Sequence, residues 1–280
     1  MRRVLLALVA MLVVALGAGA PASAVTGGTP DGNGHPYGAL LLVPGLTFCS
    51  GTLVDEDVVL TAGHCTDGWN LLKVREVWVT FDAFAAVDPV TWLPTGGTWY
   101  RTNRWSTHPS YVEANWPFTT DYGVVRLRSE VAGIKPASLP KLGVVDQLIG
   151  TSGQTDVYFA DVGYGQDGVT LAQHPYVRNF DFVRKVTRQR YSPSQGAVGT
   201  LDPLWLILGA TSSDSGGSGC GGDSGSGIFP EAAGLTNTVV AVHTGGYRMG
   251  YLNRLCGKIT SLNHRVDMPI ALNWISSFVD

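Results

Sequence analysis

The stretch from Ser212 to Gly227 reads SSDSGGSGCGGDSGSG and contains the tripeptide DSG twice, around Ser215 and around Ser224. A serine hydroxyl is a weak nucleophile, so it needs a positioned base and a third group that orients the base. On composition alone, a Gly/Ser-rich run is more often a loop without chemistry of its own. Partners elsewhere in the chain therefore decide whether either serine can act as a nucleophile.

The histidine best placed to act as the base is His64, in the segment VVLTAGHC. It follows an apolar run typical of a strand and directly precedes Cys65, whose disulfide would fix the backbone that presents the imidazole. His243 follows a buried-looking strand and is interpreted as a core or cleft histidine. The other histidines lie in polar or proline-adjacent loops and are interpreted as surface residues: His35, His108, His174 and His264.

The orienting carboxylate is assigned to Asp121, which stands immediately before the apolar run of TTDYGVVRL. A strand-end aspartate is by itself more often a turn residue. The chain order His, Asp, Ser gives the assignment its weight, because subtilisin-like chains begin with Asp and α/β-hydrolases begin with Ser. The same order disfavours lipases of the GDS type, in which the serine comes early and the histidine comes last.

The two DSG copies differ in their surroundings. Ser215 lies among serines and glycines, so no rigid element flanks it. Ser224, in CGGDSGSGIF, has Gly222 two residues before it and a strand-like apolar pair after it. The main-chain N–H groups of Gly222 and Ser224 can then point together at an oxyanion, and Cys220 can tether the loop. We therefore predict that Ser224 is the nucleophile and that Ser215 is a loop residue.

The elements that must position these residues are predicted to be strands. The 280 residues include 36 glycines and 15 prolines, which suit tight turns and are unfavourable inside helices, so the composition favours an all-β body. Short apolar runs between turn residues are predicted as strands: ALLLV at Ala39, DVVLTA at Asp57, EVWVTF at Glu76, YGVVRL at Tyr122, DVYFADV at Asp156 and TVVAVH at Thr238. One helix is expected at the end of the chain, with Asp267 as its cap and an apolar face formed by Met268, Leu272, Ile275 and Phe278 or Val279.

Residues 1–24 are predicted to be a secretory signal peptide. Two arginines precede an apolar run from Val4 to Leu16, and small residues ending at Ala24 form an A-x-A cleavage site. An uncleaved membrane anchor is the competing interpretation, but the run is shorter than the roughly 20 apolar residues that span a bilayer. The mature protein is therefore expected to be extracellular and soluble, without membrane attachment.

Secretion would expose the four cysteines to an oxidising compartment, where an even number usually forms disulfides. Four cysteines allow three pairings, of which sequence order suggests Cys49 with Cys65 and Cys220 with Cys256. Buried free thiols are the alternative. A metal site is not supported, because neither CxxC spacing nor a His/Cys cluster is present.

Charge and motif content exclude several other functions. The formal net charge of -3 provides no basic stripe of the kind that nucleic acid binding requires. No phosphate loop, dinucleotide fingerprint or metal-ligand spacing is found, so we expect neither a cofactor nor a metal. Protein or peptide substrates and protein inhibitors are the expected partners, and the protein is expected to be a monomer.

Jointly, TAGHC, DYGVVRL and CGGDSGSG resemble the three catalytic blocks of the chymotrypsin-like (trypsin-fold) serine proteases. The similarity extends to VTGG, HPSY, VGYG and the closing LNWI, and so spans nearly all of the chain after residue 24. It implies one peptidase domain over residues 25–280, with two packed antiparallel β-barrels at about 25–145 and 146–265, and a C-terminal helix. It also implies that His64 and Asp121 come from the first barrel and Ser224 from the second, with the active site in between, and it agrees with the suggested cysteine pairing.

The sequence departs from this family after the nucleophile and in the predicted pocket wall. Ser226 and Gly227 stand where the family usually has Gly and Pro, which bears on the shape of the cleft beside Ser224. The segment from Gly245 to Cys256 is longer than the short pocket wall typical of trypsins, which bears on substrate preference.

A third departure is that no propeptide separates the predicted signal peptide from VTGG. Cleavage after Ala24 would free the amino group of Val25. By resemblance, this ammonium inserts into the body and pairs with Asp223, the residue before the nucleophile. An unpaired buried carboxylate is strongly unfavourable, so we expect export itself to activate the enzyme.

By the same resemblance, the floor of the primary specificity pocket falls at Ser218, with walls near Gly245 and Gly257. Cleavage after Lys or Arg normally needs a carboxylate at the floor. A serine with glycine walls instead suggests an open pocket for apolar or aromatic side chains. The nearby Asp214, and a longer wall that carries Arg248 and Arg254, are features that could reshape the pocket.

The sequence therefore predicts a secreted serine endopeptidase that works through an acyl-enzyme intermediate. Three alternatives are weighed against this prediction. A non-catalytic binding protein on the same fold is disfavoured by the retention of all three triad positions together with Gly222 and Asp223. A serine esterase of another fold is disfavoured by the absence of a G-x-S-x-G pattern and by the triad order. For a purely structural β protein, the constellation would be a coincidence.

Overall fold

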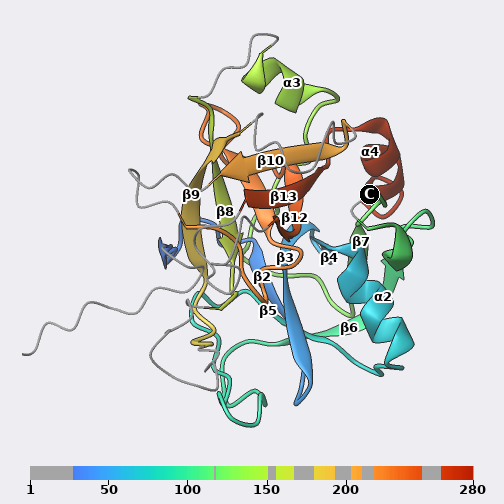
Figure 1. Ribbon diagram of the computed structural model, residues 1–280. Coiled ribbons are helices and arrows are strands. Elements are labelled where there is room, and N and C mark those ends of the chain that lie inside the picture. The colour runs from blue at the N-terminus through green and yellow to red at the C-terminus, as the bar shows by residue number, and fades with distance from the viewer. Residues whose placement is uncertain are drawn as a thin grey trace, which may run out of the picture.

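The computed structural model describes residues 28–116, 118–150, 156–166, 180–192, 203–209, 217–247 and 260–279. The first half of the chain forms a closed barrel of six antiparallel strands in the order β2-β3-β4-β7-β6-β5 (Figure 1). These strands are β2 (Gly38–Val43), β3 (Thr47–Asp55), β4 (Val58–Thr61), β5 (Trp78–Thr80), β6 (Tyr100–Thr107) and β7 (Gly123–Leu127).

The second half forms another antiparallel sheet, in the order β1-β9-β10-β13-β12-β11-β8. An additional pairing of β8 with β9 closes six of these strands into a second barrel, to which the short β1 (Thr29–Pro30) is added along β9. The six strands are β8 (Tyr158–Gly163), β9 (Lys185–Tyr191), β10 (Trp205–Gly209), β11 (Gly227–Pro230), β12 (Ala241–Tyr247) and β13 (Thr260–Arg265). The predicted all-β class with two packed antiparallel barrels is thus confirmed.

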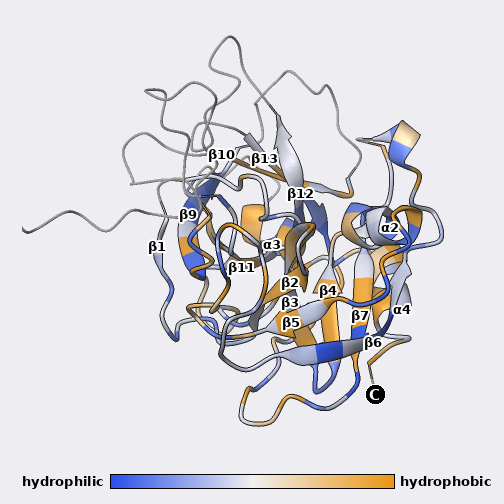
Figure 2. Ribbon diagram, turned by 90° about the horizontal axis from the view of Figure 1, so that it is seen from below, coloured by the Kyte–Doolittle hydropathy of each residue, from blue (hydrophilic) through white to orange (hydrophobic). Residues whose placement is uncertain are grey.

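The burial of β2 on both faces explains why its sequence is a continuous apolar run without alternating polar residues. All of its residues are buried. Leu41 points into the core of the first barrel, whereas Leu40 and Leu42 pack in a cluster with Tyr164 and Phe182 from the second half of the chain. Since successive side chains point to opposite faces, a strand that is covered on both faces must be apolar throughout. Figure 2 shows this apolar character along β2, β3, β4 and β7.

Most of the predicted strands are present. The runs at Ala39, Asp57, Glu76, Tyr122 and Asp156 correspond to β2, β4, β5, β7 and β8. The run at Thr238 begins too early, because the ladder of β12 starts only at Ala241. The N–H of Val239 donates instead to the carbonyl of Ser138, a residue between the barrels, at 3.0 Å.

Short helices accompany the barrels: α2 (Gly63–Leu71), α3 (Val144–Ile149), α4 (Pro269–Ile275) and the 3-10 turn η1 (Glu113–Asn115). The predicted C-terminal helix is α4, which buries Ala271 and Ile275. The prediction that Asp267 caps it was wrong, because Met268 occupies the N-cap position without a side-chain hydrogen bond. The Asp267 carboxylate is occupied elsewhere: it accepts hydrogen bonds from the Arg265 guanidinium and, at 2.8 Å, from the N–H of Val145.

A buried ion pair ties the beginning of the described chain to both barrels. Arg184, just before β9, is fully buried, and its Nε donates to Asp31 Oδ2 at 2.9 Å. Its Nη1 also donates to the carbonyl oxygens of Gly38 and Phe81 in the first half, at 3.2 and 2.7 Å. The pair thereby fixes the end of β1 beside the beginning of β9.

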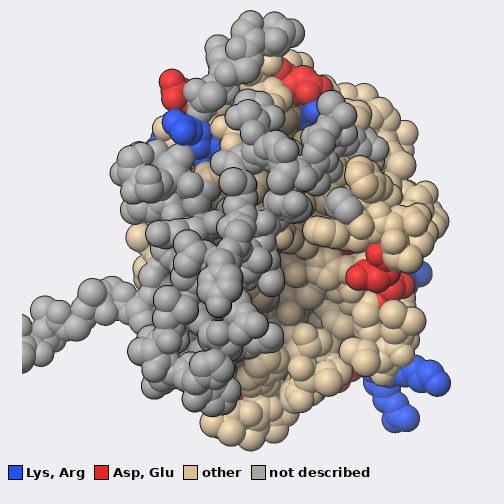
Figure 3. Space-filling model, in the orientation of Figure 1, with Lys and Arg blue, Asp and Glu red and all other residues tan. Residues whose placement is uncertain are grey.

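In the part of the chain that the structure describes, no helix has the length and apolar character needed to cross a bilayer. On the face shown in Figure 3, the charged side chains of the described residues lie in a few small groups near the edges of the view.

Candidate active site

His64 is held at the junction between β4 and α2. It is the second residue of α2, which begins directly after the end of β4. The next residue, Cys65, forms a disulfide with Cys49 of β3, with 6.5 Å between the two Cα atoms. The predicted Cys49–Cys65 pairing is therefore confirmed, and the cross-link fixes the backbone on which the imidazole stands.

The carboxylate of Asp121 holds His64 through two hydrogen bonds. Asp121 lies just before β7 and is fully buried. Its Oδ1 accepts the main-chain N–H of His64 at 2.7 Å, and its Oδ2 lies 2.8 Å from His64 Nδ1. Because an ionised carboxylate can only accept, Nδ1 carries the ring proton. In the neutral imidazole, Nε2 is then left as the acceptor, which is the tautomer that a general base requires.

The charges of the pair stabilise each other. Burial alone lowers the pKa of His64, but the charge of Asp121 and its hydrogen bond outweigh this effect, so the pKa lies above the ordinary value of 6.5. Burial alone raises the pKa of Asp121, but the charge and hydrogen bonds of His64 outweigh it, so this pKa lies below 3.8. An imidazolium at His64 is therefore favoured whenever a proton reaches Nε2.

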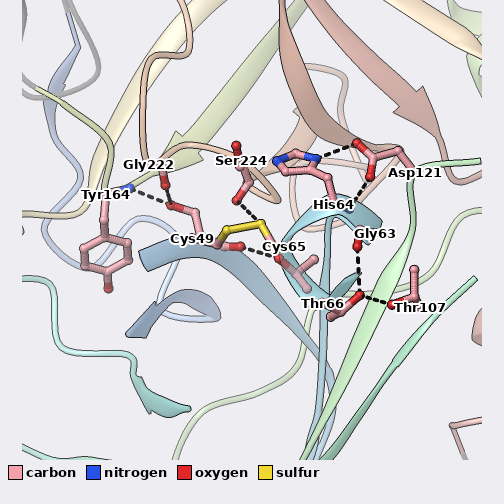
Figure 4. Close-up of a disulfide and its surroundings, with 12 residues drawn as sticks. Cys49, Gly63, His64, Cys65, Thr66, Thr107, Asp121, Tyr164, Gly222 and Ser224 are labelled. Atoms are coloured by element: carbon pink, nitrogen blue, oxygen red, sulfur yellow. Dashed lines mark hydrogen bonds and ion pairs between the residues drawn. A yellow bond between two sulfur atoms is a disulfide. The ribbon is translucent and has the colours of Figure 1, made fainter. Parts of the chain in front are cut away.

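Ser224 stands on the other side of His64 from Asp121. Figure 4 shows the imidazole between the two residues, with Nε2 on the side of Ser224. Within the described part of the chain, no hydrogen bond joins the Ser224 hydroxyl to His64. Such bonds are often long in the absence of substrate and tighten when it binds.

Ser50, on β3 of the first barrel, holds the loop that carries Ser224 through two hydrogen bonds, called the Ser50 clamp below. The N–H of Ser50 donates to the carbonyl of Ser224 at 2.8 Å, and its hydroxyl donates to the carbonyl of Gly222 at 2.9 Å. Gly225 has φ of 87° and lies so close to Thr61 that a side chain would collide with it. Only glycine combines this backbone conformation with so close an approach.

The oxyanion site is expected at the main-chain N–H groups of Gly222 and Ser224. Gly222 has φ of 97°, a conformation that side chains rarely adopt. Among the described residues, the N–H groups of Gly222 and Ser224 donate to no acceptor, whereas those of Asp223 and Gly225 donate to the carbonyls of Cys220 and His243. The two groups are therefore available to an external oxygen.

Asp223 is a fully buried carboxylate behind this loop. Its Oδ1 accepts the N–H of Gly165 at 2.7 Å, and its Oδ2 accepts the N–H of Cys220 at 2.8 Å. Burial and the neighbouring charge of Asp161 raise its pKa well above the ordinary value. The residue expected to pair with it, Val25, lies outside the described residues.

The expected specificity pocket is described in part. Ser218 is fully buried, and Gly245, on β12, lies beside Trp116 of the first half of the chain. Cys220 is in a disulfide bond, but its expected partner is not described. The expected residues outside the described part are Asp214, Ser215, Arg248, Arg254, Cys256 and Gly257.

The sequence was compared with models of known protein families, and residues 24–266 match the family model described as trypsin. The chain belongs to the trypsin family. The resemblance seen in the sequence motifs is thereby confirmed, and the two barrels have the arrangement that the trypsin family implies. The segment from His64 to Ser224 is thus part of a trypsin-family serine protease domain.

Several histidines of this trypsin-family chain differ from their interpretation. His243 is a core histidine, as expected, with only 2% of its surface exposed. The interpretation of His108 and His264 as surface residues was wrong, because both are buried. His264 lies in β13, where its ring packs against Tyr122 and Trp205, and His108 packs against Trp274 of α4. His174 lies outside the described residues.

Two sets of polar contacts around the site were missed in the sequence. One is the clamp by Ser50, which appears in an apolar strand context without any motif. The other joins Ser226 to Asp161, a carboxylate within the apolar run of β8. Two signals could have revealed it: the charge inside an apolar strand and the serine at a position where the trypsin family usually has glycine. Among the described residues, no group of three His, Cys, Asp or Glu side chains is arranged to hold a metal ion.

Proposed function

We propose that the protein is a secreted serine endopeptidase in which Ser224 is the nucleophile, His64 the general base and acid, and Asp121 the residue that orients His64. The observation that carries the proposal is the position of the His64 imidazole, 2.8 Å from the buried carboxylate of Asp121 and with its other nitrogen on the side of Ser224. A serine becomes a competent nucleophile through this combination of a base and an orienting group.

The reaction is acyl transfer in two steps. His64 Nε2 takes the proton of the Ser224 hydroxyl as its oxygen attacks the carbonyl carbon of the peptide bond. The imidazolium then donates this proton to the leaving amine, the C–N bond breaks, and an acyl-enzyme ester remains on Ser224. A water molecule, deprotonated by His64, attacks the ester, and the proton returns to Ser224 as the new carboxylic acid leaves. Asp121 stabilises the imidazolium in both steps.

The negative charge that develops on the substrate oxygen is stabilised by the N–H groups of Gly222 and Ser224. Their freedom from other acceptors within the described chain and the positive φ of Gly222 support this role. Fixed donors at the position of a developing oxyanion are usually the largest single contribution to catalysis of this kind. No cofactor takes part in either step.

The ammonium of Val25, freed by cleavage after Ala24, pairs with Asp223 in the active form. The strand register supports this, because Pro30 of β1 and Gly163 of β8 both pair with Lys185. A side chain on Gly163 would collide with the Asp223 carboxylate, so this carboxylate lies beside β8, and β9 alone separates β8 from β1. Val25 is three residues before Gly28, and three extended residues reach about 10 Å.

Secretion and the nature of the partners follow from the same features. The disulfide between Cys49 and Cys65 is of the kind that persists in an oxidising compartment, and the N-terminal sequence resembles a signal peptide. Membership of the trypsin family implies peptide substrates. We expect the enzyme to act outside the cell on protein chains, as a monomer, and to be open to protein inhibitors.

The specificity pocket accepts apolar or aromatic side chains in this proposal. Ser218 is uncharged at the floor, and Gly245 leaves one wall without a side chain. The indole of Trp116 lies against that wall and adds apolar surface. A strong preference for Lys, Arg, Asp or Glu before the cleaved bond would show that another residue lines the pocket.

The test is a cleavage profile of a mixed peptide library by mass spectrometry, comparing the secreted wild type with Ser224→Ala and Ser215→Ala. We expect cleavage by the wild type and Ser215→Ala, and almost none by Ser224→Ala. Equal loss in both variants would refute the assignment of Ser224. A correctly processed wild type that leaves the whole library intact would favour the non-catalytic binding protein, and cleavage of esters alone would favour an esterase.

N-terminal sequencing of the active protein tests the activation step separately. We expect the sequence to begin at Val25 and Asp223→Ala to lose activity. An active protein that begins far from Val25, or a fully active Asp223→Ala variant, would contradict the pairing of Val25 with Asp223.

A further inference from the structure

A group of buried polar side chains lies inside the second barrel, directly behind the loop of residues 220–226 that carries Ser224, called the nucleophile loop below. Its centre is Asp161 of β8, which is fully buried. Its Oδ1 accepts the hydroxyl of Ser226 at 2.5 Å, and its Oδ2 accepts the side-chain amide of Gln189 at 3.0 Å. The mechanism proposed above uses none of these groups. Because burying a carboxylate is strongly unfavourable, its presence here calls for a specific role.

Ser226 is the link between this group and the reaction. It stands two residues after Ser224, and its main chain is already held on both sides. The N–H of Ser226 donates to the carbonyl of Asp223 at 2.8 Å, and its carbonyl accepts the N–H of His243 at 2.9 Å. The side-chain bond to Asp161 adds an anchor in a third direction, so the peptide after Ser224 can neither shift nor rotate without breaking it.

Asp161 is itself rigidly placed. It pairs in register with Thr187 of β9 on one side and with Ile228 of β11 on the other, so both neighbouring strands hold its backbone. The amide of Gln189, also on β9, fixes the second carboxylate oxygen. A carboxylate whose backbone pairs with two strands and whose second oxygen is held by Gln189 is a firm support for a residue that must be oriented.

Charged and titratable groups face Asp161 from the neighbouring elements. His243 of β12 brings its Nδ1 to 3.7 Å from Asp161 Oδ2, and this ring is held by Ser261 of β13 at 3.0 Å. Asp223, from the nucleophile loop, is close enough that the charge of Asp161 raises its pKa. Lys185 of β9 is buried nearby and lowers it. Asp161 therefore acts on both sides of Ser224: its charge acts on Asp223, and its hydrogen bond holds Ser226.

We propose that Asp161 is a positioning residue for the peptidase reaction: through the hydroxyl of Ser226 it fixes the peptide that follows Ser224. This contact sets the direction of the Ser224 hydroxyl and of its N–H toward the substrate carbonyl. The inference rests on the proposed function. It gives a role to the serine at position 226, where the trypsin family usually has glycine, because glycine has no group that could reach Asp161.

The test compares steady-state kinetics of Asp161→Asn, Ser226→Ala and the double variant on a peptide that the wild type cleaves. A loop displaced by a fraction of an ångström loses transition-state stabilisation and little ground-state binding. We expect kcat to fall about 10- to 100-fold in each single variant, with KM within about 2-fold of the wild type. Because both changes remove the same contact, kcat of the double variant should be no lower than kcat of the slower single variant.

The matched control is Asp267→Asn. Asp267 is an equally buried carboxylate beyond the last strand of the second barrel; among the described residues it is bonded to Arg265 and Val145 and to none in the loop that carries Ser224. We expect it to leave kcat unchanged even if it lowers the thermal unfolding temperature. Should Asp161→Asn fail to fold, Ser226→Ala removes a single oxygen atom and carries the test alone.

The outcomes separate this inference from the proposed function. A wild type without peptidase activity refutes the proposed function and, with it, this inference. An active wild type refutes only the inference in three cases: Asp161→Asn and Ser226→Ala behave like Asp267→Asn, the change appears in KM alone, or the two losses multiply in the double variant. A shared loss of kcat at constant KM supports it.

Discussion

The hydroxyl of Ser50, on β3 of the first barrel, donates a hydrogen bond to the carbonyl oxygen of Gly222, in the loop of the second half of the chain that carries Ser224, at 2.9 Å. The same hydroxyl accepts the N–H of Tyr164 at 3.0 Å, and the Ser50 N–H donates to Ser224. One residue of the first barrel thus bonds the carbonyls on both sides of Asp223. Any sliding of one barrel against the other would change the peptides that face the substrate.

We expect Ser50→Ala to reduce kcat about 10-fold, because the Gly222 peptide loses its hydrogen bond and turns more freely away from the substrate oxygen. Steady-state kinetics on a cleavable peptide measure this. Thr102→Val is the control, since the buried hydroxyl of Thr102, on β6, accepts the N–H of Val77 within the first half of the chain and has no other partner among the described residues. Equal kinetics of Ser50→Ala and the wild type would show that the clamp does not act on the reaction.

The pH dependence of kcat/KM reports on the pair formed by His64 and Asp121. In the proposed mechanism the neutral imidazole of His64 is the base, and its pKa is raised, so activity should fall as the pH drops through a value above 6.5. Asp121→Asn removes the charge that raises this pKa. We expect its activity limb to move to lower pH, while kcat falls by about 10⁴-fold, as in the general Ser-His-Asp template. An unmoved limb would mean that another group controls it.

The unfolding free energy should depend on pH through Asp161. Burial raises the pKa of its carboxyl, against the opposing effects of His243, Ser226 and Gln189. The stability that such a group contributes is complete below the unfolded pKa and is lost as the pH rises through the folded pKa. Above that pH, Asp161→Asn should therefore be at least as stable as the wild type. Its unfolding free energy should also decrease less than that of the wild type as the pH rises from acid to neutral.

Denaturant unfolding at several pH values tests this expectation and sharpens the test of the positioning role. A variant that is as stable as the wild type but slower cannot owe its lower kcat to unfolding. Identical pH slopes for the wild type and Asp161→Asn would show that Asp161 has the same pKa in the folded and unfolded chain.

Removal of the disulfide by the double variant Cys49→Ala/Cys65→Ala should lower the unfolding free energy. The cysteines are 16 residues apart, and closing a loop of this length corresponds to about 3 kcal/mol. We also expect kcat to fall, since His64 adjoins Cys65. Urea unfolding and peptide kinetics measure the two effects, and the double variant is preferable to reduction of the wild type, which would also reach Cys220. Unchanged stability would contradict the role assigned to the cross-link.

The sequence allowed the fold class and the assignment of candidate residues, because both depend on local patterns. Apolar runs between glycines and prolines predicted β2, β4, β5, β7 and β8 correctly. The order of His64, Asp121 and Ser224 depends only on position in the chain. The choice between Ser215 and Ser224 remains a prediction, since only the second lies in the described chain.

Contacts between distant segments could not be predicted in this way. The Asp267 carboxylate met the rule for a helix cap, yet Arg265 and the N–H of Val145 compete for it in the folded chain. His264 has the local sequence of a surface residue, but it is buried because β13 pairs with a strand on each side, β10 and β12. The hydrogen bond from Ser50 to Gly222 joins two residues that are 172 positions apart, and no periodicity in the sequence predicts such a contact.

The bond between Ser226 and Asp161 has a consequence for how this chain could change over evolutionary time. A glycine at position 226 would leave the carboxylate of Asp161 without its hydroxyl donor, and an apolar residue at position 161 would leave the hydroxyl of Ser226 without its acceptor. Either replacement alone is unfavourable, because both side chains are fully buried and one of them would lose its partner. Replacing Ser226 and Asp161 together removes both polar groups and should be tolerated. Homologous sequences should therefore exchange the two positions as a pair, with serine and aspartate retained or lost together.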